Sequence, residues 1–196
     1  MNVKMFKSES LKSSSLYCII TFILLSLSTP SNAENIPAYD RGLFGNWKDF
    51  DNDCQNTRHE LLQILSLDEF TLTDNTCRVL TGLWLDPYTN MYFSMSSELD
   101  IDHLVPLKYA WSRGAYNWSK SKRVKFSNDE SNLLAVKKSV NRQKSAMGPA
   151  MWLPPSDNFK CEYIKLFQGI VTKYDLMQAN DELSQIRIKI TKFCSN

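Results

Sequence analysis

Four polar side chains near the middle of the chain have types that could together hydrolyse a phosphodiester bond. They are Asp102, His103, Asn132 and Asn141. The Asp102 carboxylate and the Asn141 amide oxygen are hard ligands, and such a pair suits Mg²⁺, which keeps its other positions for water and substrate phosphate. The His103 imidazole titrates near neutral pH and could take a proton from water, while Asn132 could hydrogen-bond this ring and fix its orientation. The set therefore indicates metal-assisted attack of water on a phosphate.

The order of the surrounding motifs matters more than any one of these residues. A single histidine beside an aspartate is more often structural than catalytic, so the pair alone is weak support. Three segments follow one another along the chain: DIDHLVPL (100–107), NDESNLLAV (128–136) and NRQKSAMGP (141–149), with a basic, aromatic insertion (108–125) between the first two. Together they favour one assembled site over an isolated histidine.

The segments that carry these residues have the pattern of two strands followed by a helix. Residues 98–105 are rich in apolar side chains and end at Pro106, which cannot continue the hydrogen bonding of a strand. Residues 133–136 form a second apolar run, and residues 137–145 have the composition of a short polar helix. In an ideal strand Asp102 and His103 would face opposite sides, but at the end of a strand both can reach one site.

Charge is distributed unevenly along the chain, and its middle is strongly basic. Residues 104–144 hold ten basic and two acidic side chains, whereas residues 34–103 hold four basic and thirteen acidic ones. A basic segment could bind a polyanion such as nucleic acid; the alternative is a solvated face that folds back on the acidic half. Trp111 and Trp118 could stack on bases or pack under a loop. The candidate phosphate contacts are Lys108, Arg113, Lys137, Lys138, Arg142 and Lys144.

The first 33 residues have the three parts of a signal peptide. Lysines precede the apolar run LYCIITFILLSL (16–27), and Ser31 and Ala33 place small residues at the −3 and −1 positions of a cleavage site. The run is too short to span a bilayer comfortably; the alternative is an uncleaved anchor. We therefore expect residues 1–33 to be removed, and residues 34–196 to form one domain exported to the periplasm or the cell exterior.

The sequence before the central unit predicts a supporting layer. Residues 57–65 have helical apolar spacing, and residues 78–85 and 91–94 are apolar runs around a turn, so we expect a helix and a β-hairpin. The acidic sequence DFDND (49–53) could bind calcium, but it lacks the glycine and distal glutamate of an EF-hand loop. A solvated acidic turn is the preferred interpretation.

Four cysteines remain after signal cleavage, and an even number in an exported chain predicts disulfides. Residues 161–174 and 181–194 each carry a helical apolar stripe. In an antiparallel hairpin of two such helices Cys161 would lie beside Cys194. Cys54 and Cys77 would then pair by elimination.

Taken together, the motifs resemble those of a known nuclease family. From Tyr39 to Leu176 the chain is similar to the secreted branch of the HNH, or His-Me finger, endonucleases, whose domain also occurs at the C-terminus of GmrSD-type restriction enzymes. The landmarks are YDRGLFGNWKDFDNDC (39–54), TRHELL (57–62), GLWLDPYT (82–89), DIDHLVPL (100–107), AWSRGAYNW (110–118), FSNDESNLLAV (126–136), NRQKSAMGPAMWLPP (141–155) and CEYIKLF (161–167).

The resemblance implies a ββα-metal site in which His103 is the general base, Asp102 and Asn141 hold the metal, and Asn132 supports the histidine. Arg58 falls in the TR-x-E landmark, where it could reach the site or make a structural contact. The third letter of the HNH pattern is Asn141 here rather than histidine, a variant similar to the HNH domain of RNA-guided CRISPR nucleases. It keeps an oxygen ligand and makes a preference for transition metals doubtful.

The expected fold is α+β: a ββα-metal core with an N-terminal helix and hairpin layer and a C-terminal disulfide-linked helical hairpin. The expected function is that of a secreted, monomeric endonuclease that uses one divalent cation, Mg²⁺ or alternatively Mn²⁺. It would cut phosphodiester bonds in DNA rather than RNA, with little sequence preference and no membrane association after signal cleavage. The alternative is a non-catalytic nucleic-acid-binding module on a decayed nuclease fold, against which the intact set of four residues argues.

Overall fold

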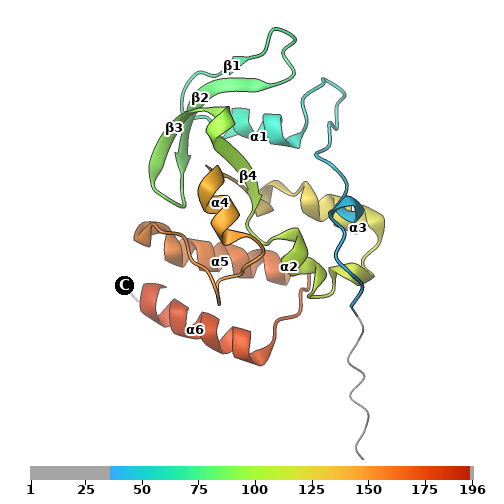
Figure 1. Cartoon of the computed structure of the whole chain (residues 1–196), viewed down its shortest axis with the longest axis vertical. Helices are drawn as coiled ribbons and strands as arrows, with labels where there is room; N and C mark the ends of the chain where they lie inside the picture. Colours follow the sequence, from blue (N-terminus) through green and yellow to red (C-terminus); the bar gives the residue numbers. More distant parts are fainter. Residues whose placement is uncertain (1–35, 195–196) are drawn as a thin grey trace, which may run out of the picture. The chain divides into compact units, whose positions relative to one another are not determined.

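The computed structural model describes residues 36–194 (Figure 1). The expected signal peptide, residues 1–33, lies outside the described residues. The helices and strands follow in the order η1 (Arg41–Phe44), α1 (Thr57–Ile64), β1 (Thr71–Leu72), β2 (Val79–Asp86), β3 (Met91–Met95), η2 (Ser96–Glu98), β4 (Leu99–His103), α2 (Leu107–Trp111), η3 (Ala115–Asn117), α3 (Lys120–Ser127), η4 (Glu130–Asn132), β5 (Leu133–Lys137), α4 (Lys138–Lys144), α5 (Asp157–Lys173) and α6 (Asn180–Cys194). No helix among these is long and apolar enough to cross a membrane.

The N-terminal layer is an antiparallel sheet in the order β1-β2-β3, with α1 packed against β2. Asn56 begins α1 by accepting hydrogen bonds from the backbone N–H groups of Arg58 and His59, which a helix start would otherwise leave unpaired. The expected helix and hairpin are confirmed within one or two residues. The short strand β1 was not predicted, because two residues carry no recognisable period.

β4 and β5 form a separate antiparallel ribbon whose two faces enter two different cores. The register pairs Ile101 with Ala135 and His103 with Leu133. Ile101, Ala135 and Leu133 pack with α1, β2 and β3 around the buried Trp84. Because alternate side chains point to opposite faces, Asp100 and Asp102 lie on the other face, where Asn141 and Lys144 of α4 contact them. The expected order of strand, strand and helix is therefore present.

The second core is aromatic and is built mainly by helices. Phe126 and Tyr174 meet edge to face with ring centroids 4.8 Å apart, and Tyr109 and Phe167 do so at 5.0 Å. Such pairs add specific geometry to the burial of large apolar surfaces. Trp111 is buried in this core and Trp118 packs against it, so the packing interpretation of both tryptophans is confirmed.

Two helices, α2 and α3, lie in the insertion where no element was predicted. α3 contains four cations in eight residues and few apolar side chains, so it shows little helical periodicity. Its start is fixed locally by Ser119, whose hydroxyl accepts a hydrogen bond from the Lys122 N–H. Tertiary packing supplies the rest, because Phe126 is fully buried at its far end.

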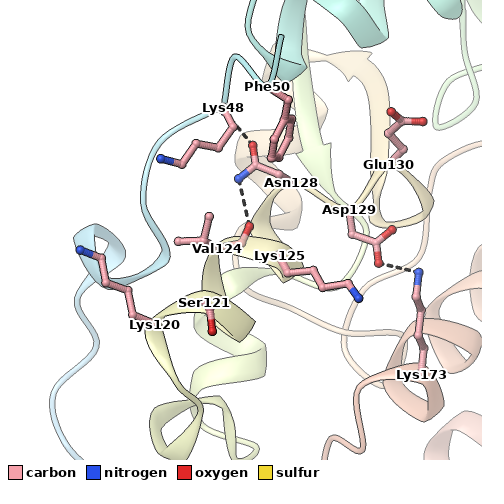
Figure 2. A pocket seen from close by; sticks show the side chains of 10 residues that line it. All are labelled: Lys48, Phe50, Lys120, Ser121, Val124, Lys125, Asn128, Asp129, Glu130 and Lys173. Atoms are coloured by element: carbon pink, nitrogen blue, oxygen red, sulfur yellow. Dashed lines mark hydrogen bonds and ion pairs between the residues drawn. The ribbon is translucent and has the colours of Figure 1, made fainter. Parts of the chain in front are cut away.

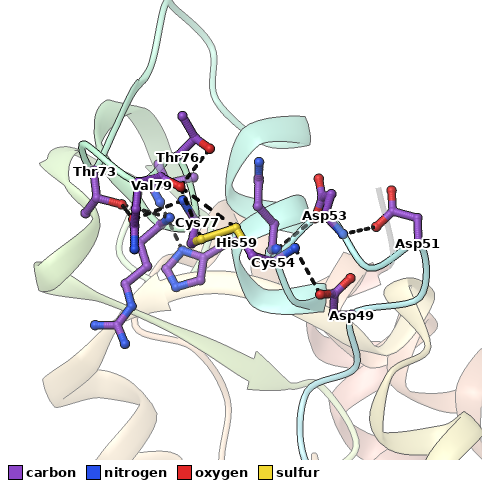
Figure 3. Close-up of a disulfide and its surroundings, with 12 residues drawn as sticks. Asp49, Asp51, Asp53, Cys54, His59, Thr73, Thr76, Cys77 and Val79 are labelled. Atoms are coloured by element: carbon purple, nitrogen blue, oxygen red, sulfur yellow. Dashed lines mark hydrogen bonds between the residues drawn. A yellow bond between two sulfur atoms is a disulfide. The ribbon is translucent and has the colours of Figure 1, made fainter.

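Both expected disulfides are present in the structure. Cys161–Cys194 joins the first turns of α5 to the end of α6, and the two helices pack as the expected hairpin. Cys54–Cys77 ties the acidic turn that precedes α1 to the loop before β2 (Figure 3). The mixed α and β architecture and its two bridges agree with the sequence prediction.

Candidate active site

His103 ends β4 with its imidazole ring almost fully buried and held on two sides. Nε2 lies 2.9 Å from the Ser127 carbonyl oxygen. A carbonyl oxygen only accepts, so Nε2 carries the proton and Nδ1 keeps its lone pair. The Trp47 indole stacks nearly parallel on the ring, with centroids 5.2 Å apart. These contacts fix both the tautomer and the plane of the imidazole.

The surroundings of His103 keep the ring neutral. Burial lowers the pKa of His103 to about 3; the Ser127 hydrogen bond opposes this shift, while the nearby cations Arg41 and Lys144 reinforce it. Since the pKa lies far below neutral pH, the ring is in its basic form at pH 7. Nδ1, for which no hydrogen bond is described among residues 36–194, is the nitrogen that could accept a proton. With a pKa of about 3 it is a weak base until a nearby anion, such as a bound phosphate, favours the charged ring.

A polar cleft of about 260 Å³ collects the predicted side chains on one side of the ribbon end. His103, Asp102 and Asn141 all line it, although His103 and Asp102 are consecutive in β4. The prediction that both could address one site at a strand end agrees with this arrangement. Lys108 also lines the cleft and places an exposed ammonium at it.

The carboxylate of Asp102 is buried and already has two partners. The Lys144 ammonium lies 2.8 Å from one carboxylate oxygen, which also accepts a hydrogen bond from the Tyr88 hydroxyl at 2.7 Å. Lys144 donates a further bond to the His103 carbonyl oxygen at 2.8 Å. Burial raises the pKa of Asp102 and lowers the pKa of Lys144, and the ion pair between them opposes both shifts. Lys144 therefore balances the charge of Asp102 inside the protein.

This position differs from the one expected for Lys144. Its side chain has no exposed surface, so it cannot meet a phosphate from solvent in this structure. The sequence showed a lysine three residues after Asn141 but not which face of α4 would carry it. We correct the expectation of a nucleic-acid contact to that of an internal counter-ion.

Asn132 was expected to hydrogen-bond the His103 imidazole, but it bonds the backbone of Val105 instead. Its amide oxygen accepts a hydrogen bond from the Val105 N–H at 2.8 Å, and its amide nitrogen donates to the Val105 carbonyl at 3.3 Å. The backbone N–H of Leu104 donates to the Asn132 carbonyl at 2.8 Å. Asn132 thus fixes the turn that follows His103, whereas Ser127 and Trp47, not Asn132, hold the imidazole.

Arg58 makes the structural contact that was the alternative to a catalytic role. Its guanidinium donates to the carbonyl oxygens of Ser96 and Leu99 at 3.2 and 3.1 Å, which ties α1 to the start of β4. Burial lowers the pKa of Arg58, and the nearby Asp100 opposes that shift. Arg58 does not line the cleft around His103. His59 accepts a hydrogen bond from the Val79 N–H at 3.1 Å, which links α1 to β2.

Asn141 is half-buried and offers an amide oxygen at the cleft. Its side-chain nitrogen donates to the Asp100 carboxylate at 3.1 Å, which leaves the amide oxygen for another partner. Asp100 was part of the DIDH motif but received no role from the sequence. The donor set fits a hard divalent cation in kind, since it combines the Asn141 oxygen with the carboxylates of Asp100 and Asp102. Asp102 could join only if its contacts with Lys144 and Tyr88 were rearranged or shared.

The cleft also contains residues that sequence reasoning did not identify. Tyr39 and Arg41 reach it from the segment before α1, about sixty residues earlier than His103. Trp47 completes the histidine environment from the same segment. The landmark YDRGLFGNW contains all three, but nothing in its spacing shows that it lies beside β4. Only the tertiary structure brings them together.

The other residues that were predicted to contact phosphates differ in their exposure and in their ion pairs. Lys108 and Arg142 are exposed, and Lys137 and Lys138 are half-buried where β5 continues into α4. Arg113 is engaged, because it forms an ion pair with Glu182 at 2.7 Å and its guanidinium lies 3.5 Å above the Tyr109 ring. Its role in this structure is to connect α2 with α6.

The acidic turn of residues 49–53 gathers three carboxylates outside the cleft (Figure 3). Oxygens of Asp49, Asp51 and Asp53 lie within 4.8 Å of one another. However, Asp49 accepts from the Cys54 N–H at 3.0 Å and Asp53 from the Gln55 N–H at 2.7 Å. These local bonds agree with the preferred interpretation of an acidic turn.

The sequence profile described as "GmrSD restriction endonucleases, C-terminal domain" matches residues 48–186. The match covers more than half of the chain, and the chain belongs to this family. It is also 35% identical over 150 residues to an "Uncharacterized secreted protein" of Arthroderma benhamiae, across 76% of this chain and 72% of that protein. No solved structure matches the chain. A secreted relative and two disulfides are consistent with export.

Proposed function

We propose that this chain is an exported, metal-dependent endonuclease that hydrolyses phosphodiester bonds, with DNA as its substrate and little sequence preference. Membership of a restriction-endonuclease domain family supports a nuclease-related function. The observation that carries the proposal is the state of His103, a neutral imidazole with a defined tautomer at a cleft that also contains Asp102 and Asn141.

In the proposed mechanism His103 is the general base. Its Nδ1 accepts a proton from a water molecule, and that water attacks the phosphorus atom of a diester bound in the cleft. The Ser127 carbonyl stabilises the imidazolium that results, because Nε2–H donates to it throughout. Lys108 and Arg41 attract the anionic substrate to the cleft.

Asn141 and Asp102 would hold a divalent cation, with Asp100 close to Asn141 and able to contribute. A bound Mg²⁺ or Mn²⁺ would polarise the phosphate and stabilise the leaving oxygen. The buried Lys144 ammonium neutralises the negative charge of Asp102, one of these proposed ligands. The Asn141 amide leaves an oxygen-only ligand set, which suits hard cations.

One observation favours the alternative, a non-catalytic nucleic-acid-binding module. Both oxygens of Asp102 have hydrogen-bond partners, so this carboxylate is not simply free to accept a metal. A binding module would retain the basic surface and need no general base. The two functions differ in whether the chain cuts its ligand.

A plasmid-nicking assay separates the two functions. Supercoiled DNA should be nicked in the presence of Mg²⁺ or Mn²⁺, not in EDTA, and His103→Ala should reduce the rate by roughly 100-fold to 10,000-fold. His59→Ala is the matched control, because His59 lies outside the cleft. Thermal unfolding of both variants would show that each is folded. A His103→Ala protein that nicks at the wild-type rate at pH 7 would refute the mechanism.

A further inference from the structure

A second, larger hollow lies beside the candidate active site and has no role in the mechanism above. Its volume is about 810 Å³, and it is walled by the segment after Trp47, by α3 and by the start of the turn that leads into β5 (Figure 2). Four lysines line it against two carboxylates: Lys48, Lys120, Lys125 and Lys173 against Asp129 and Glu130. We call it the lysine pocket.

Of the four lysines only Lys173 has an ion pair among the described residues, so the four lysines outnumber the two carboxylates of the pocket. Lys173 forms an ion pair with Asp129 at 2.6 Å. Burial raises the pKa of Asp129, but hydrogen bonds from Lys173, Tyr174 and Ser131 outweigh it and lower the pKa overall, so Asp129 stays ionised and neutralises Lys173. Among residues 36–194, no ion pair is described for Lys48, Lys120 or Lys125. Figure 2 shows the ends of these three side chains without drawn partners. The pocket therefore attracts anions.

The pocket also has an exposed aromatic side chain. Phe50 is 69% exposed, whereas most aromatic side chains among residues 36–194 lie in or against the two cores. An isolated exposed phenylalanine is not unusual by itself. Here it stands at a basic hollow, and this combination is the one used by proteins that bind single-stranded nucleic acid, with lysines along the backbone and an aromatic ring for stacking.

The walls of the lysine pocket continue into the candidate active site. Trp47 stacks on His103, and the next residue, Lys48, lines the pocket. Ser127 accepts the hydrogen bond from His103, and the next residue, Asn128, lines the pocket as well. The two walls are joined, because the Lys48 N–H donates to the Asn128 side chain at 2.9 Å. A smaller hollow containing Trp47, His103 and Ser127 lies against the same two walls.

We propose that the lysine pocket holds an unpaired stretch of the nucleic-acid strand that flanks the scissile phosphate. Lys48, Lys120 and Lys125 contact its phosphates, and Phe50 stacks on one of its bases. The inference rests on the proposed nuclease function and adds to it a substrate class, strands with a single-stranded region next to the cut. A continuous duplex would keep its bases stacked on each other and would leave Phe50 without a partner.

Binding measurements in EDTA test this subsite without depending on cleavage. The probe is a fluorescein-labelled oligothymidylate, and its anisotropy gives the affinity of the wild-type chain, of Phe50→Ala and of Lys120→Ala/Lys125→Ala. Tyr92→Ala is the control for an exposed aromatic ring, and Lys165→Ala/Arg187→Ala is the control for charge, since all three residues are exposed outside the pocket. Thermal unfolding confirms that each variant is folded.

We expect Phe50→Ala to weaken binding about fivefold or more, because stacking contributes roughly 1–3 kcal/mol per base. The lysine pair should weaken binding and reduce the salt dependence by about 0.7 in log–log slope for each phosphate that is no longer neutralised. The two controls should stay near wild-type affinity. This pattern would support the subsite even if the plasmid assay showed no cleavage.

Any of the following results would overturn the proposal. One is unchanged affinity of both pocket variants, or no binding of the oligonucleotide by the wild-type chain. Another is an equal loss on a duplex of the same sequence, which would assign these residues to double-stranded DNA. The third is inorganic polyphosphate competing equally well with wild type and Phe50→Ala, which would make the pocket a general polyanion site.

Discussion

At the scale of single residues, His103 is a buried histidine whose protonation state and tautomer are set by its surroundings. Its neutral state results from burial, and its tautomer results from a single carbonyl acceptor, Ser127. Neither property depends on Asp102, although the two residues are adjacent in sequence. Asp102 instead belongs to a separate buried group with Lys144 and Tyr88.

The Asp102–Lys144 pair leads to a prediction about stability. Lys144→Met would leave a buried carboxylate without its cation, and breaking a buried pair in this way typically destabilises by about 3–5 kcal/mol. Urea unfolding should show this loss, whereas Lys138→Met, a half-buried lysine on the same helix, should change little. A Lys144→Met protein within about 1 kcal/mol of wild type would contradict the assignment of a charged pair.

The double variant Asp102→Asn/Lys144→Met completes the experiment. It removes both charges, so part of the lost stability should return, since the uncompensated charge is the main penalty. Activity should not return, because the proposed metal ligand is gone. Recovery of nicking together with stability would mean that Asp102 serves only the fold.

At the scale of elements, the sequence predicted the site-bearing unit well. Pro106 and the apolar runs defined β4 and β5, and the start of α4 was placed within one residue. These signals are local, so they can be read from spacing alone. α2 was missed because five residues are too few to show a helical period, and α3 because it is highly charged and stabilised by tertiary packing.

The candidate site was predicted less completely than its elements. The residue types at Asp102, His103 and Asn141 suggested one site, and the structure places all three at one cleft. The hydrogen-bond partners of Asn132 and Lys144 could not be predicted from the sequence. The side chain of an asparagine at a strand end, or of a lysine in a helix, can point in several directions. Arg41 and Trp47 were missed for the same reason: their contacts join distant segments of the chain.

The C-terminal helix α6 gives a prediction at this scale. Among its described side chains only Ile186 is buried, so α6 relies on polar links, those of Glu182 and Lys189, and on the disulfide at its end. The Cys161–Cys194 bridge closes a separation of 33 residues, and the chain-entropy relation gives it about 3–4 kcal/mol. Cys161→Ser/Cys194→Ser should lower the unfolding free energy by about this amount and speed amide exchange throughout α6.

Plasmid nicking provides the control for that variant. No residue of α6 lines the cleft around His103, so the rate should stay near that of the wild type. Loss of nicking without loss of stability would show an unexpected dependence of the site on α6. Exchange confined to the last turn would show that packing, rather than the bridge, holds the helix.

At the scale of the whole molecule, the two hydrophobic cores both include side chains of the β4–β5 ribbon. The face of β4 and β5 that includes Ile101 closes the N-terminal core, and the face that includes Val136 closes the aromatic core. Neither core is complete without these strands, and His103 lies where the ribbon ends. The stability of both cores therefore supports the geometry of the site.

This arrangement predicts a single cooperative unfolding transition. Trp84 reports on the first core and Trp111 on the second, because each is buried in one of them. Comparison of the wild-type chain with Trp84→Phe and Trp111→Phe isolates the two fluorescence signals. Their denaturant midpoints should coincide after correction for each variant's own stability. Two separated transitions would show that the cores unfold independently.

The stack of Trp47 on His103 has an optical consequence. An indole in van der Waals contact with an imidazole loses emission when the imidazole becomes charged, because the cation accepts an electron from the excited ring. The two rings here are almost parallel, with centroids 5.2 Å apart. The difference in fluorescence between the chain and its Trp47→Phe variant should therefore report on the protonation of His103 without an attached label. Trp47 is thus an intrinsic fluorescent probe beside the residue proposed as the general base.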